Sequence, residues 1–342
     1  MKISIGMTLQ QGAWGGGNQF GYALTKYLKQ KGINVCFDLS APDIDLILLT
    51  EPRKNLAISA FNDVDIVKYL YTKNKRALVV HRINECDERK GTIDVNRRLI
   101  RANLCADYTV FVASWLRELF LKQGLANGSS TVILNGSDRD IFNPKGHERW
   151  AGRPERLQFV THHWGANWLK GFDIYQRFDQ MLGKDEYKER FSFTYIGNLP
   201  EGFEFKNARY VLPKHGIELA DLLRHHHVYL TASQNEPGGN HQNEGANCGL
   251  PLLFRESGCM PEYCTGYGIS FNENNFEQKL HEMADTYDIW AGKMKNYPHT
   301  ADRMCEQYHQ LFNMLLNNRD KILARRKWSR HLLWLATTIV SR

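Results

Sequence analysis

The fold is decided by the stretch Glu236-Pro237-Gly238-Gly239-Asn240-His241-Gln242-Asn243-Glu244-Gly245-Ala246-Asn247-Cys248-Gly249-Leu250-Pro251. An apolar, β-branched run at 228–231 leads into it and predicts a strand, which the Pro-Gly-Gly turn at 237–239 must end. From Asn243 onward the pattern predicts a helix, and the backbone N–H groups at a helix start favour an anion. The carboxylates of Glu236 and Glu244 lie on either side of this turn and suit the hydroxyls of a sugar and of a ribose. The stretch therefore predicts a polar ligand site rather than a piece of core.

The rest of the chain alternates short apolar strands with helical stretches. In the first half, strands are predicted at 3–6, 33–37, 44–49, 77–81, 108–112 and 131–134, with a helix at 18–31. In the second half, strands are predicted at 157–161, 191–196, 228–231 and 252–254, with helices at 172–182, 218–224, 276–284 and 300–316. This alternation is typical of the α/β class, in which helices cover both faces of a parallel sheet. We therefore expect two Rossmann-like, doubly wound domains that face a central cleft, with the carboxyl ends of their strands turned toward it.

A turn-rich segment divides the chain. With 342 residues the protein exceeds the usual size of a single core, so two domains are expected. We place the linker at 144–156, between an N-terminal domain at 1–143 and a C-terminal domain at 157–299. A helix at 300–318 follows and is expected to pack back on the N-terminal domain, and 319–342 form a basic amphipathic tail.

Composition and charge exclude several classes of protein. Apolar content of 42% and charged content of 24% are those of a globular protein, and no apolar run approaches the roughly 20 residues that span a bilayer. The first residues predict a strand rather than a signal peptide, and seven scattered cysteines indicate reduced thiols in a cytosolic compartment. The tail alone holds seven basic residues against one acidic residue, so most of the net charge of +7 lies there. The remainder is nearly neutral, and a nucleic-acid partner is not expected.

A second motif is the glycine loop between the first predicted strand and the first predicted helix. Glycines at Gly15, Gly16 and Gly17 let the backbone approach a diphosphate and present N–H groups at the helix start. A dinucleotide site is the rival interpretation, but the G-x-G-x-x-G pattern would need a glycine at position 20, where Phe20 stands. The third interpretation is a tight turn that binds nothing.

The C-terminal domain carries a matching segment, His162-His163-Trp164-Gly165-Ala166-Asn167-Trp168-Leu169-Lys170-Gly171-Phe172-Asp173. It follows the first strand of that domain, as the glycine loop does in the N-terminal domain. A lysine at a helix start opposes the helix dipole unless an anion offsets it, so Lys170 favours a diphosphate site over a solvated surface lysine. A further segment, 132–138, predicts a strand that ends in the turn Asn135-Gly136 just before the linker.

With these segments in order, the chain resembles a retaining glycosyltransferase of family 4 with the GT-B fold, over roughly residues 1–318. The two glutamates, Glu236 and Glu244, are the most specific part of the resemblance. The Asn-Gly-x-Asp turn at 135–138, the Lys-Gly-Phe-Asp loop at 170–173 and the segment Gly258-Cys259-Met260-Pro261-Glu262 support it independently. The resemblance implies an acceptor-side domain at 1–143, a nucleotide-sugar-binding domain at 157–299, and transfer of a sugar to a glycan or lipid-linked glycan.

The resemblance also implies a role for individual residues. Glu236 would contact hydroxyls of the donor sugar, Glu244 would bind the nucleotide ribose, and Lys170 would neutralise the leaving diphosphate. The remaining donor-binding residues would be the glycines of the N-terminal loop together with His163, Asn167, Gly238, Gly239 and Asn240. Members of the family usually carry an arginine five residues before the lysine, where this chain has Gly165; His162, His163, Asn167 or Arg255 are the candidates to compensate. No cofactor and no metal is implied, and the co-substrate would be a UDP- or GDP-sugar.

The N-terminal domain offers further polar residues after its strand at 77–81. The resemblance favours a histidine here, near sugar and acceptor, so His81 is a candidate catalytic residue, with a structural histidine as the alternative. Arg82 and Asn84 are candidates for the acceptor, as are Arg97 and Arg98. The basic residues Arg89, Lys90, Arg97, Arg98 and Arg101 would suit an acceptor that carries phosphate, and a solvated helix face is the alternative.

The remaining features bear on metals, membranes and rival functions. The run at 225–227 is three histidines, but neighbouring residues at a strand point to opposite faces and do not converge on a metal. The tail at 319–342 suits an interfacial helix on anionic lipid, with docking on the protein's own surface as the alternative. We expect a cytoplasmic protein, peripheral on the inner face of the membrane if the tail binds lipid. The rival functions are a sugar-nucleotide epimerase or phosphorylase of the same fold, and a non-catalytic glycan- or nucleotide-binding protein.

Overall fold

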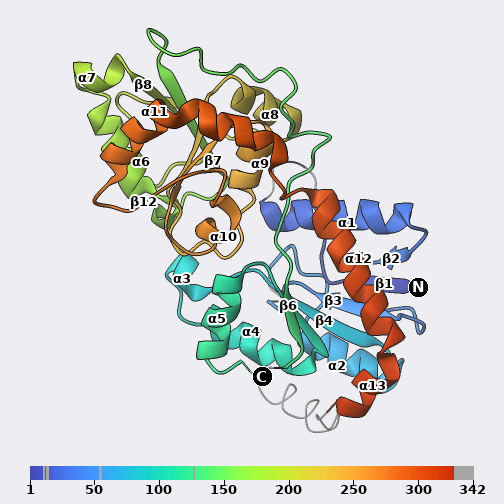
Figure 1. Ribbon diagram of the computed structural model, residues 1–342. Coiled ribbons are helices and arrows are strands. Elements are labelled where there is room, and N and C mark those ends of the chain that lie inside the picture. Colours follow the sequence, from blue (N-terminus) through green and yellow to red (C-terminus); the bar gives the residue numbers. More distant parts are fainter. Residues whose placement is uncertain (11, 13–14, 54–55, 126–127, 327–342) are drawn as a thin grey trace.

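The chain folds into two parallel β-sheets, each flanked by helices (Figure 1). The computed structural model describes residues 1–10, 12, 15–53, 56–125 and 128–326. Within these residues the first sheet has the strand order β2-β1-β3-β4-β5-β6, and the second has the order β12-β11-β10-β7-β8-β9. Neighbouring strands in both sheets run parallel, as the alternation of strands and helices predicts.

The first sheet and its helices form the N-terminal domain. Its strands are β1 (Lys2–Ile5), β2 (Asn34–Cys36), β3 (Leu46–Leu49), β4 (Leu78–Ile83), β5 (Tyr108–Phe111) and β6 (Ser130–Val132). Its helices are α1 (Gly16–Gln30), α2 (Asp63–Thr72), α3 (Asp87–Lys90), α4 (Val95–Ala102), the 3-10 helix η1 (Asn103–Cys105) and α5 (Ser114–Lys122). The sequence predicts α1 from the apolar residues on one of its faces, and Phe20, Leu24 and Leu28 are buried there.

The second sheet and its helices form the C-terminal domain. Its strands are β7 (Leu157–His163), β8 (Phe191–Gly197), β9 (Arg209–Val211), β10 (Val228–Thr231), β11 (Leu252–Arg255) and β12 (Gly268–Phe271). Its helices are η2 (Trp168–Lys170), α6 (Phe172–Met181), α7 (Asp185–Lys188), α8 (Gly216–Arg224), α9 (His241–Asn247), α10 (Met260–Cys264), α11 (Phe276–Lys293) and η3 (Met294–Asn296). The predicted boundaries at 143 and 157 stay predictions.

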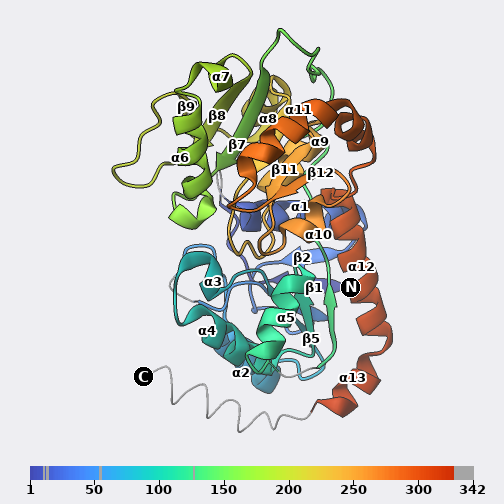
Figure 2. The same ribbon diagram turned by 60° about the vertical axis from the view of Figure 1, so that its left-hand side comes forward.

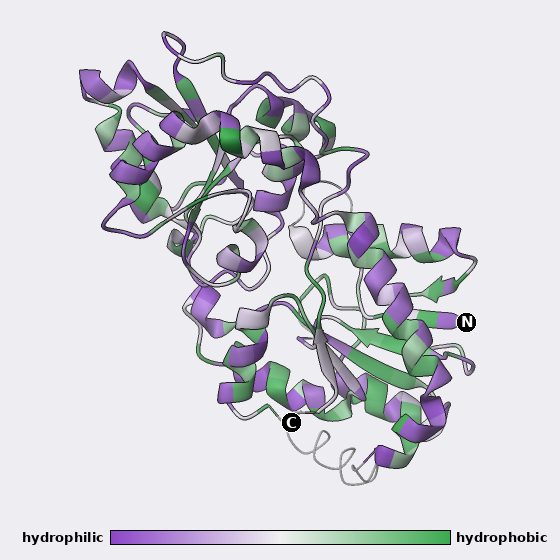
Figure 3. Ribbon diagram, viewed as in Figure 1, coloured by the Kyte–Doolittle hydropathy of each residue, from purple (hydrophilic) through white to green (hydrophobic). Residues whose placement is uncertain are grey.

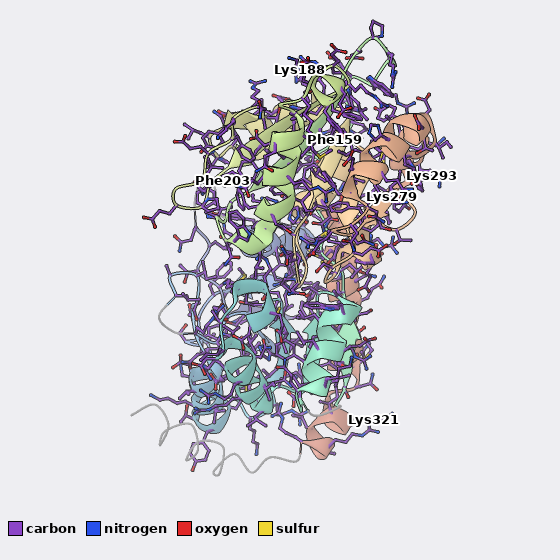
Figure 4. The ribbon with its side chains drawn as sticks, turned by 90° about the vertical axis from the view of Figure 1, so that its left-hand side faces the viewer. Phe159, Lys188, Phe203, Lys279, Lys293 and Lys321 are labelled. Carbon is purple, nitrogen blue, oxygen red and sulfur yellow. The ribbon has the colours of Figure 1, made fainter. Side chains whose placement is uncertain are left out.

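Apolar side chains gather between the sheets and their helices. Figure 3 shows hydrophobic strands inside and hydrophilic stretches on the outer helices. In the second domain Phe159 of β7 is fully buried against Phe178 of α6, with ring centroids 5.4 Å apart. Figure 4 shows Phe159 between the layers and Lys188 and Lys293 at the periphery, where both are exposed. Burial of this kind fixes each sheet and leaves the loops at the strand ends to carry function.

The last long helix returns to the N-terminal domain. Helix α12 (Ala301–Asn317) crosses α1 and contacts it (Figure 1, Figure 2). The ring of Tyr308 lies 5.2 Å from that of Phe20, and Phe312 is fully buried in the same cluster. Gly136 makes this return possible, because a Cβ atom there would meet the carbonyl carbon of Thr300 at 2.2 Å. The helix expected at 300–318 therefore lies on the N-terminal domain.

The first part of the basic tail also contacts the N-terminal domain. Helix α13 (Arg319–Arg325) follows α12, and Arg319 donates to Asp45 at 2.7 Å. Arg326 donates through Nε to Asp107 at 2.6 Å, and both side chains of that pair are almost fully buried. These two arginines are therefore bound to carboxylates of the protein itself. The remainder of the predicted membrane-binding tail, 327–342, lies outside the described residues.

Candidate functional site

A cavity of about 340 Å³ lies between the two domains. Its walls include the carboxyl ends of strands and the loops that follow them. These strands are β1 and β4 in the first sheet and β7, β8 and β10 in the second. The carboxyl ends of parallel strands meet at one edge of a sheet, and ligands of open α/β sheets bind there. The lining includes these residues that the sequence predicts for the site: Gly15, Gly16, Gly17, Arg82, Asn84, His163, Asn167, Lys170, Glu236, Gly238, Gly239, Asn240 and Glu244.

Glu236 lines this cavity, and its carboxylate is bound to two cationic side chains. The loop after β10 reaches it through Asn235, which has a positive φ of 50° that asparagine tolerates better than most side chains. Lys170, from η2, donates from Nζ to Oε2 of Glu236 at 2.9 Å, and Arg89, from α3, donates from Nε to the same oxygen at 3.1 Å. The side chains of Glu236 and Arg89 are only 7% and 6% exposed. One buried carboxylate oxygen thus joins a cation from each domain.

Burial and charge act in opposite directions on these groups. Burial alone would raise the pKa of the Glu236 carboxyl, but the Lys170 ammonium and then the Arg89 guanidinium outweigh it and hold that pKa below its ordinary range. Burial lowers the pKa of the Lys170 amine, although the Glu236 carboxylate opposes the shift. The Glu236 carboxyl is therefore ionised at neutral pH, and it accepts hydrogen bonds rather than donating them.

Glu244 lies on α9, which the glycine turn positions against β7. Its Oε2 is 2.6 Å from Nε2 of His162, and its Oε1 accepts from Nδ2 of Asn240 at 3.3 Å. Nδ1 of His162 is 3.0 Å from the hydroxyl of Tyr229, which fixes the ring. Asn240 also donates to Oε1 of Gln19 in α1, at 3.0 Å. The carboxylate of Glu244 is held in place by polar partners at the wall of the cavity.

The glycines of both turns permit close contact between the domains. A Cβ atom at Gly238 would lie 2.4 Å from Cγ2 of Val112, and one at Gly16 would lie 3.3 Å from Cβ of Asn240. Between these contacts lies Asn135, at the end of the segment that follows β6. Its amide donates to the carbonyl of Gly238 at 2.6 Å, and its Oδ1 accepts from Nη2 of Arg82 at 2.9 Å. The Asn-Gly turn of the sequence is therefore a connector of the two domains as well as a turn.

Two buried histidines, His163 and His241, line the cavity together with Lys170 and Glu236. Nε2 of His163 is 2.8 Å from the hydroxyl of Tyr175, and Nε2 of His241 is 2.9 Å from Oγ1 of Thr231. Burial lowers the pKa of both imidazoles, and the neighbouring positive charges lower it further. Both rings are therefore neutral at neutral pH, so they contribute shape and hydrogen-bonding capacity rather than charge.

Several residues that the sequence suggested do not reach the cavity. His81 is a correction: it lies inside β4 on the face opposite Arg82, fully buried, with Nδ1 2.9 Å from Oδ1 of Asn103. Because side chains alternate along a strand, Arg82 faces the cavity and His81 cannot. The pairing of His81 with Asn103 fits the alternative of a structural histidine.

The candidate acceptor residues of α4, Arg97 and Arg98, also lie outside the cavity. Arg97 pairs with Asp94 on the surface, where its side chain is 83% exposed. Arg98 pairs with Asp63 and donates to the carbonyl of Pro52. Neither lines the cavity: Arg97 faces solvent, and Arg98 is turned toward the buried Asp63 at the start of α2. Arg255 does not line the cavity either, and it is bound to Asp173 and Glu273.

The structure adds residues to the site that the sequence did not assign to the donor. Arg89 is foremost among them, and Gln19, Asn135 and His241 also line the cavity. Local pattern holds no signal for Arg89, since its carboxylate partner is 147 residues away. Among the described residues, no cluster of three histidines, cysteines or carboxylates has the arrangement of a metal site, and no helix there is long and apolar enough to cross a membrane.

Solved structures share this fold. A glycosyltransferase from Rickettsia africae ESF-5 is 12% identical, with a TM-score of 0.62 over 93% of this chain and 98% of that chain. The catalytic domain of starch synthase IV from Arabidopsis thaliana, bound to ADP and acarbose, is 14% identical, with a TM-score of 0.61 over 88% of this chain and 78% of that chain. The protein has the GT-B fold.

A third structure of this kind is a UDP-forming α,α-trehalose-phosphate synthase from Burkholderia xenovorans in complex with glucose-6-phosphate. It is 11% identical, with a TM-score of 0.60 over 86% of this chain and 77% of that chain. No protein-family model matches the chain, and no curated protein matches its sequence. The GT-B fold confirms the predicted pair of Rossmann-like domains facing a cleft, and identities this low establish the fold alone.

Proposed function

We propose that the protein is a retaining glycosyltransferase of the family 4 type. It would transfer a sugar from a nucleotide-diphosphate donor to a hydroxyl of a glycan, free or lipid-linked. The observation that carries the proposal is the buried pair of Lys170 and Glu236 in the cavity of a GT-B fold, with Glu244 on the same wall. A cation for a leaving group and carboxylates for hydroxyls are the groups that this reaction needs.

The charge of the cavity supports a diphosphate donor. Five cationic side chains line it, Arg82, Arg89, Lys90, Lys170 and Lys214, against the three carboxylates Glu85, Glu236 and Glu244. An excess of positive charge in a partly buried cleft attracts an anion. The similar structures include a starch synthase bound to ADP and a UDP-forming synthase. We therefore propose a UDP-, GDP- or ADP-sugar as the donor.

In the proposed reaction each of these groups has a separate role. The bond between the anomeric carbon and the diphosphate oxygen breaks, and Lys170 stabilises the negative charge that develops on the departing diphosphate. Glu236 accepts hydrogen bonds from hydroxyls of the sugar, and Glu244 accepts them from the ribose. The acceptor oxygen bonds to the same face of the anomeric carbon, and its proton passes to a phosphate oxygen of the leaving group. Because Lys170 supplies the positive charge, we propose that the reaction needs no metal.

A donor-hydrolysis panel tests the proposal. Wild-type protein is incubated with UDP-, GDP- and ADP-sugars labelled in the sugar, and release of the nucleoside diphosphate is measured with and without glycan acceptors. We expect release with at least one donor, and a loss of about 100-fold or more in Lys170→Ala and in Glu236→Ala. The matched controls are Lys188→Ala and Glu186→Ala, because both of those side chains are exposed and outside the cavity.

The products separate this proposal from its rivals. Retention predicts that the new glycosidic bond has the anomeric configuration of the donor, which NMR of the product reads directly. An inverted product contradicts the retaining mechanism but leaves the proposal of a glycosyltransferase standing. An epimerase would change the sugar of the donor without any acceptor. Near-normal rates in both site variants would contradict the assignment of Lys170 and Glu236.

A further inference from the structure

Arg89 is a buried arginine of the N-terminal domain whose side chain lies in the site of the C-terminal domain. It sits on α3, and its Nε donates to Oε2 of Glu236 at 3.1 Å. That oxygen already accepts from Lys170 at 2.9 Å. A second hydrogen bond supports the contact between Arg89 and Glu236, because Nδ2 of the preceding residue Asn235 donates to the carbonyl of Glu88 at 3.2 Å. Helix α3 is therefore fixed against the loop that carries Glu236.

The guanidinium of Arg89 retains an unused donor. Its Nη1 is buried and has no hydrogen-bond partner anywhere in the described part of the chain, and its side chain is 6% exposed. Burying a charged donor without a partner is costly, so such a group in a native protein calls for an explanation, such as a functional role or a bound ion. Arg89 lines the cavity, so a ligand there is within its reach.

The charges around Arg89 favour an anion as that ligand. Lys170 and Arg89 share one carboxylate oxygen, which leaves one positive charge uncompensated at that point. Arg82 lines the same cavity and donates to the amide oxygen of Asn135 rather than to a carboxylate. Within the described lining, cationic side chains exceed carboxylates by two. The diphosphate bridge of a nucleotide sugar carries two negative charges.

We propose that Arg89 binds the diphosphate of the donor together with Lys170, so that each domain supplies one cation to the leaving group. This inference rests on the proposed function, because it assumes a nucleoside diphosphate in the cavity. Its consequence is that diphosphate binding holds the two domains together through Arg89. The competing role is a structural ion pair with Glu236 that only stabilises the domain contact.

Nucleotide affinities distinguish the two roles. UDP, GDP and ADP, and the matching monophosphates, are titrated calorimetrically into the wild type, Arg89→Gln and Arg97→Gln. Arg97→Gln removes the same charge from the same domain at an exposed site outside the cavity. Loss of a charge-assisted hydrogen bond weakens binding by about tenfold to 100-fold. We expect that loss for the diphosphate in Arg89→Gln only, with the monophosphate affinity changed by less than about threefold.

Each other outcome overturns a defined statement. Equal losses for diphosphate and monophosphate, or no loss in Arg89→Gln, overturn the role of Arg89 while the proposed function stands. If the wild type binds none of the nucleoside diphosphates, the proposed function falls and the role of Arg89 falls with it. Arg89→Lys is the second variant, and thermal melting checks that all variants are folded. Because lysine keeps the charge, we expect Arg89→Lys to retain more of the diphosphate preference than Arg89→Gln, and equal loss in both contradicts the charge argument.

Discussion

Glu236 is the residue at which the two halves of the molecule meet. One of its two carboxylate oxygens, Oε2, accepts hydrogen bonds from Lys170 of the C-terminal domain and from Arg89 of the N-terminal domain. A buried carboxylate of this kind is stable only while its cations remain, because an unpaired buried charge is costly. A ligand anion in the cavity would have to share these two cations with Glu236.

At this scale the sequence predicted Lys170 and Glu236 for the donor, whereas it offered Arg89 only as one of five basic residues that would suit an acceptor carrying phosphate. Lys170 is conspicuous because a lysine opposes the dipole at a helix start, and Glu236 is conspicuous because it precedes a glycine turn. Arg89 stands among other basic residues, Lys90, Arg97 and Arg98, which look alike in sequence. Only tertiary structure separates them: Arg89 turns into the cleft, whereas Arg97 and Arg98 pair with nearby carboxylates.

Gly238 provides a test of the close contact between the domains. A methyl group at this position would lie 2.4 Å from Cγ2 of Val112, which is fully buried. We expect Gly238→Ala to destabilise the protein by about 1–3 kcal/mol and to weaken nucleotide binding, because the domains must shift apart. Gly165→Ala is the control, since its nearest atom would be Cε of Lys170 at an ordinary 3.8 Å. Thermal melting measures the stability of both variants. Equal melting temperatures for Gly238→Ala and Gly165→Ala would contradict the close contact between Gly238 and Val112.

Among the elements, α12 shows that the end of the chain completes the N-terminal core. The sequence predicted a helix at 300–316, and the structure places it at 301–317. Other elements were not predicted. Strand β9 is a three-residue edge strand, largely exposed, that lacks an apolar run, and β12 begins with a glycine whose Cβ position is filled by the carbonyl oxygen of Leu252. Short edge strands form because a neighbouring strand offers hydrogen bonds, which a local pattern does not report.

Phe312 tests the role of α12. It is fully buried in the cluster that includes Phe20 and Tyr308, and its ring centroid is 5.8 Å from that of Tyr308. We expect Phe312→Ala to lower the free energy of unfolding by about 3–5 kcal/mol through the cavity that it leaves. Met314→Ala, on the exposed side of the same helix, should change it by less than about 0.5 kcal/mol. Denaturant titration followed by tryptophan fluorescence gives both values, and similar values would show that α12 does not belong to the core.

For the whole molecule, buried neutral histidines set the response to acid. Burial lowers the pKa of His81, of His226 and of His299 to about 4. In the unfolded chain a histidine has a pKa of about 6.5. Between these two values the unfolded state binds more protons than the folded state, so stability falls as the pH falls. Each group contributes a loss of up to about 1.4 kcal/mol per pH unit in this window.

Melting temperatures at pH 7.5 and pH 5 measure this loss. We expect a lower melting temperature at pH 5, and a smaller difference between the two pH values in His226→Gln. His226 is suited to the test because it lies away from the cavity, bound to Thr194 and to the carbonyl of Leu222. His225→Gln is the neighbouring control, at an exposed position. A melting temperature that does not change between the two pH values would contradict the burial of these neutral rings.

The central claim is that the cleft between the two domains binds a nucleoside diphosphate through Lys170. Calorimetric titration of UDP, GDP and ADP into the wild type and Lys170→Ala tests it most directly, with Lys188→Ala as the exposed control. The account predicts that at least one of the three nucleoside diphosphates binds the wild type and Lys188→Ala with the same affinity. In Lys170→Ala its binding free energy is expected to weaken by about 1.5–3 kcal/mol, the contribution of a hydrogen bond to a charged group. Binding of none of them, or binding to Lys170→Ala as tight as to the wild type, would contradict it.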